Sequence, residues 1–332
     1  MNSRVLFVLC AFAALLAYPW VGGKFGVDLV NKIMIYAIFA LSLELLVGGT
    51  GLVCFGQAAF FGIGAYATVL LSPTAEAGSL CLLLLASALM AGLYALVVGS
   101  LSLRTKGVYF IMVTLAFAQM AYYVVHDTPL GGGTDGIYLN VKPAMGQLID
   151  LEDPLVMYQF TLAMLVLTFG FLAVLLRSRF GHALAGIRVN EQRMRATGFA
   201  TYPYKLAAFT LSGTLAGLAG FLFAVKDGFV NPEMMSWHLS GAVLIMIILG
   251  GLGHLRGALI GAFAFALLQE LFKSEAVFGA LAKHWHLGLG LTIIASVALL
   301  PRGLVGVPGQ IRERLIGRSS RRAETPEVSH ER

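Results

Sequence analysis

The chain has 332 residues, of which 58% are hydrophobic and only 12% charged, and its formal net charge is +6. Its mean hydropathy is +0.83. Soluble domains are roughly one quarter charged, so this composition excludes a soluble globular protein and predicts an all-α, polytopic bundle of transmembrane helices. The basic residues stand at the ends of apolar stretches, so the positive charge does not indicate nucleic-acid binding. The three cysteines lie within apolar stretches and have no disulfide or metal-site spacing.

Apolar stretches near the roughly 20 residues needed to cross a bilayer predict about ten membrane spans. Their ranges are 5–21, 33–48, 52–71, 79–101, 108–126, 155–176, 205–225, 239–251, 257–272 and 285–301. The first overlaps the pattern of a signal peptide, but no clear small-residue cleavage site follows it, so we expect an uncleaved span. The eighth and ninth form either two short helices or one helix broken at 250–254. The transmembrane domain then covers 1–305, and 306–332 is expected to be a solvated cytoplasmic tail.

A basic segment, residues 177–205, interrupts this apolar chain. It reads RSRFGHALAGIRVNEQRMRATGFATYPYK, with five arginines, one lysine and a single acid. Because positive residues favour the cytoplasmic side, we place the basic segment there, and alternation of the spans then makes both termini cytoplasmic. Six lysines fall on the opposite face, which leaves 17 of the 23 basic residues on the cytoplasmic side. The six are Lys24, Lys32, Lys142, Lys226, Lys273 and Lys283.

Within the basic segment we expect one polar helix of about fifteen residues, 182–197, because Gly198 provides a helix-stop signal. Such a helix would expose Arg188, Arg193 and Arg195. A short basic helix held against the membrane is suited to contact a soluble partner protein.

Small and polar residues inside the predicted spans indicate packing or a substrate path. Gly213 and Gly217 stand one turn apart, as do Gly253, Gly257 and Gly261, which predicts close helix contacts. The residues 51–66 are also rich in glycine and include a polar side chain, which lipid disfavours. The candidate translocation-path residues are Gln57, Gly62, Gly64, Tyr66 and Gln119. Glu44 and Glu270 lie near span ends, where a helix-terminal partner and a substrate role are both open.

A glycine-rich run follows the fifth predicted span. It lacks the Lys-Ser/Thr of a nucleotide-binding loop and does not follow a buried strand, so we expect a turn or re-entrant loop at the extracytoplasmic mouth. Its candidate residues are Gly133, Thr134, Asp135 and Gly136. We find no metal-ligand spacing and no nucleophile–base pattern, so we expect no metal, no cofactor and no enzymatic activity in this chain.

Several sequence blocks together resemble one family. The pattern G-x-A-L-x-x-I-R-x-N-E-x-x-x-R-A-x-G, followed by Y-K-L-A-A-F, resembles the cytoplasmic coupling loop of LivM-type permeases, the membrane subunits of branched-chain amino-acid ABC importers. Its residues here are Gly181, Ala183, Ile187, Arg188, Asn190, Glu191, Arg193, Arg195 and Gly198. Blocks at 56–66, 107–117, 133–136 and 249–257 are similar to the same family, and the resemblance covers about residues 30–310.

The resemblance implies an ATP-driven importer of the bacterial inner membrane that carries branched-chain or related amino acids. It implies four kinds of protein or ligand partner besides membrane lipid: a homologous second permease, two ATP-binding subunits, a periplasmic binding protein and a small-molecule substrate. The chain departs from the general coupling-loop pattern, because Gln192 stands where a Glu is usual and Glu191 is displaced by one residue. The role of Glu191 is therefore open.

Two alternatives follow from the same residues. The same type of subunit could carry urea, amides or aromatic acids. A stand-alone secondary transporter or facilitator is the alternative from another class, although the sequence supplies few of the midplane polar groups that it needs.

Overall fold

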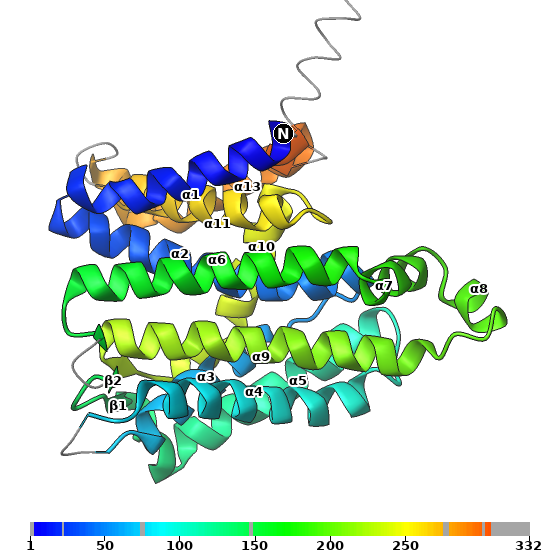
Figure 1. The fold of residues 1–332 in the computed structure, drawn as a ribbon, viewed down its shortest axis with the longest axis horizontal. Coiled ribbons are helices and arrows are strands. Elements are labelled where there is room, and N and C mark those ends of the chain that lie inside the picture. The colour runs from blue at the N-terminus through cyan, green and yellow to red at the C-terminus, as the bar shows by residue number, and fades with distance from the viewer. Residues whose placement is uncertain are drawn as a thin grey trace, which may run out of the picture.

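The computed structural model describes residues 3–21, 23–73, 77–145, 149–274, 279–300 and 303–306, and its long helices lie side by side in one bundle (Figure 1). The helices are α1 (Ser3–Val21), α2 (Lys24–Thr50), α3 (Gln57–Leu71), α4 (Leu80–Ser102), α5 (Val108–Asp127), α6 (Pro154–Arg177), α7 (Arg179–Val189), α8 (Glu191–Ala196), α9 (Thr201–Asp227), α10 (Trp237–Gly250), α11 (Leu255–Lys273) and α13 (Trp285–Leu299). The predicted all-α, polytopic class is confirmed.

Short strands and 3-10 turns connect the helices. The strands are β1 (Ile137–Tyr138), which pairs with β4 (Phe229–Val230), and β2 (Ala144–Met145), which pairs with β3 (Ile149–Asp150), both antiparallel. The 3-10 turns are η1 (Pro129–Gly131), η2 (Gly133–Asp135), η3 (Pro232–Met235) and η4 (Gly279–His284). Because β1 and β4 pair, the loop after α5 and the loop after α9 meet at one end of the bundle.

Seven helices of the described residues are long and apolar enough to cross a membrane: α2, α4, α5, α6, α9, α11 and the stretch that begins with α13. Three apolar stretches are shorter, namely Ala11–Trp20 within α1, α3 and α10. At 1.5 Å per residue, α3 and α10 are roughly 21–23 Å long, which is less than the about 30 Å of a bilayer core. The protein is therefore a multi-pass membrane protein, and the predicted count of ten spans is not established.

Two predicted boundaries near the start of the chain are wrong. The helix α2 begins at Lys24, nine residues before the predicted span, because charged residues continue it beyond the apolar stretch. One of them, Asp28, is paired at 2.9 Å with Lys226 at the end of α9. The helix of the predicted span 52–71 begins instead at Gln57. The preceding helix, α2, ends at Thr50, and it is capped by Gly51, whose φ of 76° is the left-handed conformation that stops helices.

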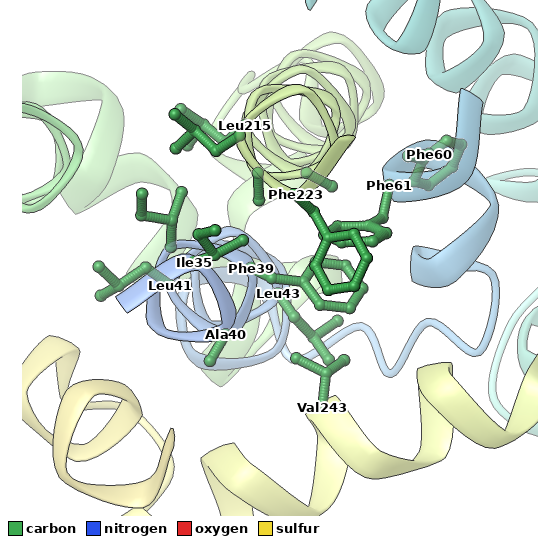
Figure 2. Packing of buried hydrophobic residues seen from close by; sticks show 14 of the residues in the cluster. Ile35, Phe39, Ala40, Leu41, Leu43, Phe60, Phe61, Leu215, Phe223 and Val243 are labelled. Atoms are coloured by element: carbon green, nitrogen blue, oxygen red, sulfur yellow. The ribbon is translucent and has the colours of Figure 1, made fainter. Parts of the chain in front are cut away.

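The centre of the bundle is formed by α2 and α9. In their most apolar stretches 83% and 78% of the residues are buried, against 17% in α5. Figure 2 shows Phe39 of α2, Phe61 of α3 and Phe223 of α9 gathered in one aromatic cluster, with Val243 of α10 directed toward it. The ring centroids of Phe39 and Phe61 are 4.8 Å apart, and those of Phe61 and Phe223 are 5.6 Å apart.

Glycines allow helices to approach each other closely. A Cβ on Gly64 of α3 would lie 2.3 Å from the carbonyl oxygen of Gly217 of α9, so a larger residue would force these helices apart. A Cβ on Gly261 of α11 would similarly lie 1.9 Å from the carbonyl oxygen of Met246 of α10. The predicted close contacts at Gly217 and Gly261 are thus confirmed. The eighth and ninth predicted spans are two separate helices, α10 and α11, packed against each other.

Candidate functional site

The basic segment contains two helices, α7 and α8, where the sequence predicts one. Between them Asn190 is extended, with φ −159° and ψ 99°, and its side-chain oxygen accepts a hydrogen bond from the backbone N–H of Arg193 at 2.9 Å. An Asn side chain in this position caps a new helix and competes with continuation of the old one. The prediction of a single helix over 182–197 is therefore wrong. Figure 1 shows α8 beyond the end of the bundle.

The C-terminal end of α8 is closed as the sequence predicts. Gly198 has a φ of 87°, and its N–H donates to the carbonyl oxygen of Arg195 at 3.0 Å. The N–H of Phe199 donates to the carbonyl oxygen of Met194 at 3.0 Å. This pair of bonds around a left-handed glycine is the Schellman motif. The six residues of α8 are thus capped at both ends.

One face of α7 is packed into the bundle. Gly181, Ala183, Leu184 and Ile187 are buried. A Cβ on Gly181 would lie 2.3 Å from the carbonyl oxygen of Leu176 at the end of α6, so the turn between α6 and α7 has room only for glycine. The motif residues Gly181, Ala183 and Ile187 therefore pack α7 against the membrane helices and do not face outward.

Arg188 links α7 to two other segments. Its guanidinium donates a hydrogen bond to the carbonyl oxygen of Gly48 in the last turn of α2. A Cβ on Gly253, in the loop between α10 and α11, would lie 3.2 Å from the same guanidinium. Carbonyls at a helix C-terminus lack partners within the helix and attract cations. Although Arg188 remains exposed to solvent, its charged group is directed at α2 and is not free for a partner protein.

Glu44 of α2 completes this junction. Its carboxylate, which is buried, accepts a hydrogen bond from the backbone N–H of Gly253 at 2.6 Å, and the charge of Arg188 acts on it. The sequence leaves open whether Glu44 has a partner at a helix terminus or a role in substrate binding. The structure provides a partner, the backbone N–H of Gly253. We call Glu44, Gly48, Arg188 and Gly253 the junction. It connects α7, α2 and the loop between α10 and α11.

Glu191 ties α8 to the start of α9. Its Oε1 accepts from Lys205 Nζ at 2.8 Å, from Arg195 Nη2 at 2.6 Å and from Thr201 Oγ1 at 3.1 Å. Burial raises the pKa of the Glu191 carboxyl, but the hydrogen bond and charge of Lys205, the hydroxyl of Thr201 and the charge of Arg195 outweigh it, and the pKa is lowered. Arg195 is exposed, as the sequence predicts, and its guanidinium is also ion-paired within the loop.

Most residues of α8 are exposed. Among them are Gln192 and Arg193, and Val189, the last residue of α7, is 85% exposed. Within the part of the chain that the structure describes, no ion pair involves Arg193. An exposed arginine with no ion-pair partner is typical of a contact surface for another protein, because arginine is enriched at protein–protein interfaces. We call Val189, Gln192 and Arg193 the outward patch.

Four of the five candidate path residues are buried in helix packing on α3. Gln57 Nε2 donates to Ser42 Oγ at 2.9 Å and to Ser212 Oγ at 3.0 Å, which joins α2, α3 and α9. Gly62 packs against Met235, Gly64 packs against α9, and the side chain of Tyr66 is buried. The fifth, Gln119, lies instead on α5 and lines a hollow with Met120 and Tyr123. The structure does not bring the five together, and their role in a path stays a prediction.

The glycine-rich run after α5 forms two 3-10 turns, η1 and η2. A Cβ on Gly136 would lie 2.3 Å from the carbonyl oxygen of Val230 in β4, so this glycine allows the two loops to meet. Thr134 and Asp135 are exposed, and Thr134 Oγ1 donates to Asp135 Oδ1 at 3.3 Å. The predicted turn is present, at the opposite end of the bundle from α8 (Figure 1).

The chain is similar to known proteins over most of its length. The family described as the permease component of branched-chain amino acid transport systems matches residues 26–297. The chain is 30% identical over 326 residues to the high-affinity branched-chain amino acid transport system permease protein LivM of Escherichia coli, which covers 91% of this chain and 75% of that protein. No solved structure matches the chain.

More distant relatives match about half of the chain. A probable branched-chain amino acid transport permease protein LivH of Methanocaldococcus jannaschii is 28% identical over 49% of this chain and 52% of its own length. The autoinducer 2 import system permease protein LsrC of Klebsiella pneumoniae is 31% identical over 43% of this chain and 40% of its own length. All three relatives are named as permease proteins of transport systems.

Proposed function

Because the chain belongs to the family of permease components of branched-chain amino acid transport systems, we propose that it is the membrane-spanning permease subunit of an ATP-driven ABC importer for these amino acids. The observation that carries the proposal is the family match over 26–297, which includes nearly every long apolar helix and the whole basic segment. The chain is a transport subunit, and ATP hydrolysis takes place on separate ATP-binding subunits.

We assign contact with an ATP-binding subunit to α8 and the adjoining end of α7, through the outward patch. Movement of α8 reaches the membrane helices through α7, because Arg188 holds the end of α2 and lies beside Gly253. A displaced α7 would therefore pull on α2, the most buried long helix, and on the loop between α10 and α11 at the same time. Rigid helices that share one junction can transmit a small displacement through the bundle.

The proposed orientation places α7 and α8 in the cytoplasm of a bacterium, with the chain in the inner membrane. The excess of basic residues on that side supports it, as does the position of the N-terminal end of α1, which lies toward the α8 end in Figure 1. Both termini are then cytoplasmic. The predicted tail 306–332 lies, apart from its first residue, outside the described residues.

Two further partners belong to the proposal. The relatives named LivM and LivH support a second, homologous permease that pairs with this chain, as the sequence predicts. A periplasmic binding protein would deliver the substrate at the end formed by β1 and β4.

The test is uptake of radiolabelled L-leucine into liposomes that contain this chain, a second permease and two ATP-binding subunits, with the binding protein added outside. We expect uptake only when ATP and all subunits are present. Uptake by this chain alone without ATP would favour a stand-alone transporter. Uptake of urea, amides or aromatic acids, with branched-chain amino acids excluded, would favour the other substrate class.

A further inference from the structure

A cavity of about 700 Å³ lies between α2, α10, α11 and α13. It is formed where α10 and α13 begin and where α11 ends, with Trp237, Trp285 and Lys273 among its lining residues. The N-terminal end of α11 follows the loop that contacts Glu44 and Arg188, and Arg188 lies at the end of α7 that leads into α8. Because the cavity is at the C-terminal end of α11, it lies at the end of the bundle remote from α8. Its volume is within the range of small-molecule sites.

Charges of both signs line the cavity. Lys32 of α2 and Lys273 of α11 supply two ammonium groups, and Glu233 of η3 and Glu270 of α11 supply two carboxylates. Across the described ranges of the chain, no ion pair joins any of these four groups to another. The Lys273 ammonium lies over the Trp285 ring, 4.6 Å from its centroid. Unpaired groups of opposite sign around one space suit a ligand that carries both charges.

The floor of the cavity is apolar. Ile33 is 1% exposed, Met246 is 2% exposed and Phe265 is 6% exposed, and all three line it. Burial of an aliphatic side chain against such a floor is favourable because it removes apolar surface from water. A small ligand with an ammonium, a carboxylate and a branched aliphatic side chain would match the rim and the floor together.

We propose that this cavity binds a free branched-chain α-amino acid on the extracytoplasmic side of the permease. The Lys32 and Lys273 ammonium groups receive its carboxylate, the Glu233 and Glu270 carboxylates receive its ammonium, and its side chain rests on the apolar floor. The buried floor favours a compact ligand over the long acyl chains of a zwitterionic phospholipid. The inference deepens the proposed function and rests on it for the choice of amino acid.

Binding can be measured by tryptophan fluorescence, because the only tryptophans of the chain are Trp20, Trp237 and Trp285. With Trp20→Phe as the background, both remaining tryptophans line the cavity. The full chain in phosphatidylcholine nanodiscs should show a saturable change on titration with L-leucine. Three analogues, glycine, 4-methylpentanoate and 3-methylbutylamine, lack the side chain, the ammonium and the carboxylate respectively, and each should bind more weakly than L-leucine. The loss for the two analogues that lack a charge should reach about fivefold, the effect of a partly exposed charge pair.

Two variants assign the effect to the cavity. Glu270→Gln and Lys273→Gln should each weaken L-leucine binding by about fivefold. The matched control Lys142→Gln, a lysine on the same predicted side but outside the cavity, should leave it unchanged. Absence of a saturable change, equal binding of the three analogues, or a change caused by phosphatidylethanolamine that L-leucine cannot displace would overturn the inference.

Transport separates this inference from the proposed function. In the complete importer, Glu270→Gln should raise the KM for L-leucine uptake while ATP hydrolysis remains coupled. Normal KM in this variant would refute the cavity and leave the proposed function intact. Failure of the unaltered importer to take up any branched-chain amino acid would refute the proposed function, and the fluorescence titration would still report whether the cavity binds L-leucine.

Discussion

The two helices of the basic segment differ in how they are held. A buried face and the Arg188 hydrogen bond to Gly48 hold α7 against the membrane helices. In contrast, α8 has no buried residue and is tied to α9 chiefly through Glu191. The difference indicates two separable tasks. In the proposed function, the outward patch contacts a partner protein, and α7 would pass the resulting displacement to α2 and to the loop between α10 and α11.

The largest expected effect is uncoupling at the junction. Arg188→Gln removes a charged hydrogen-bond donor, an interaction worth about 1.5–3 kcal/mol, so we expect at least about tenfold less uptake with normal binding of the ATP-binding subunits. Proteoliposome uptake and co-purification measure the two effects. Arg188→Lys, which retains the charge, should keep part of the uptake. Loss of subunit binding with normal uptake per assembled complex would contradict the separation of tasks.

The second effect is loss of contact at the outward patch. Arg193→Glu reverses an exposed, unpaired charge, so we expect roughly fivefold weaker association with the ATP-binding subunits and unchanged stability of the permease. Titration of the purified ATP-binding subunit against the permease measures the affinity. Arg179→Glu, an exposed arginine at the other end of the basic segment, is the matched control. Equal weakening by both variants would show that general charge, rather than the patch, controls binding.

The third effect is release of α8. Glu191→Gln removes the carboxylate that Lys205 and Arg195 share, which costs about 1 kcal/mol at this partly exposed position, so α8 should open about fivefold more often. Trypsin cleavage after Arg193 and Arg195 measures the opening. Gln192→Ala, at the neighbouring exposed position, should leave the cleavage rate unchanged. If both variants are cut at the rate of the unaltered chain, Glu191 does not hold the loop.

A smaller effect is expected at the cap between the two helices. Asn190→Ala removes the hydrogen bond to the Arg193 N–H and costs about 1 kcal/mol or less in this short, exposed helix. Hydrogen exchange in α8 should rise by up to about fivefold while exchange in α7 is unchanged. Asn190→Asp retains a capping oxygen and should restore protection. Faster exchange in α7 as well would mean that the two helices are one cooperative unit.

The smallest effect is expected from lowering the pH, which changes the stability of the loop only below about pH 5. The pKa of Glu191 is lowered below its ordinary value of 4.5, so its stabilisation of the loop is fully present above that pH and is lost as the pH falls through the lowered value. Hydrogen exchange in α8, corrected for its intrinsic pH dependence, should be constant from pH 7 to about 5 and then increase. In Glu191→Gln this acid-dependent increase should be absent. An unchanged increase in that variant would assign it to another group.

The sequence predicts the membrane-spanning class, most helix positions and the glycine stop at Gly198 because these depend on local composition and on single residues. It fails at Asn190, where a side-chain cap divides a helix whose polar pattern is continuous. It also misplaces the start of α2, since hydropathy ends at the first charges although the helix continues to Lys24. The sequence also cannot assign a role to the four candidate path residues of α3. Small and polar residues within a span are typical both of buried helix contacts and of a substrate path.

The sequence by itself determined that the chain crosses the membrane, which segment is basic and which family it belongs to. Only the tertiary structure decided what the arginines do, because their partners are distant in the chain: Arg188 reaches Gly48, 140 residues away. Glu44 and Gly253 are 209 residues apart, and Glu191 and Lys205 are 14 apart. The mixed-charge cavity likewise depends on the tertiary structure. Its four charged groups come from three segments that meet only when the bundle is packed.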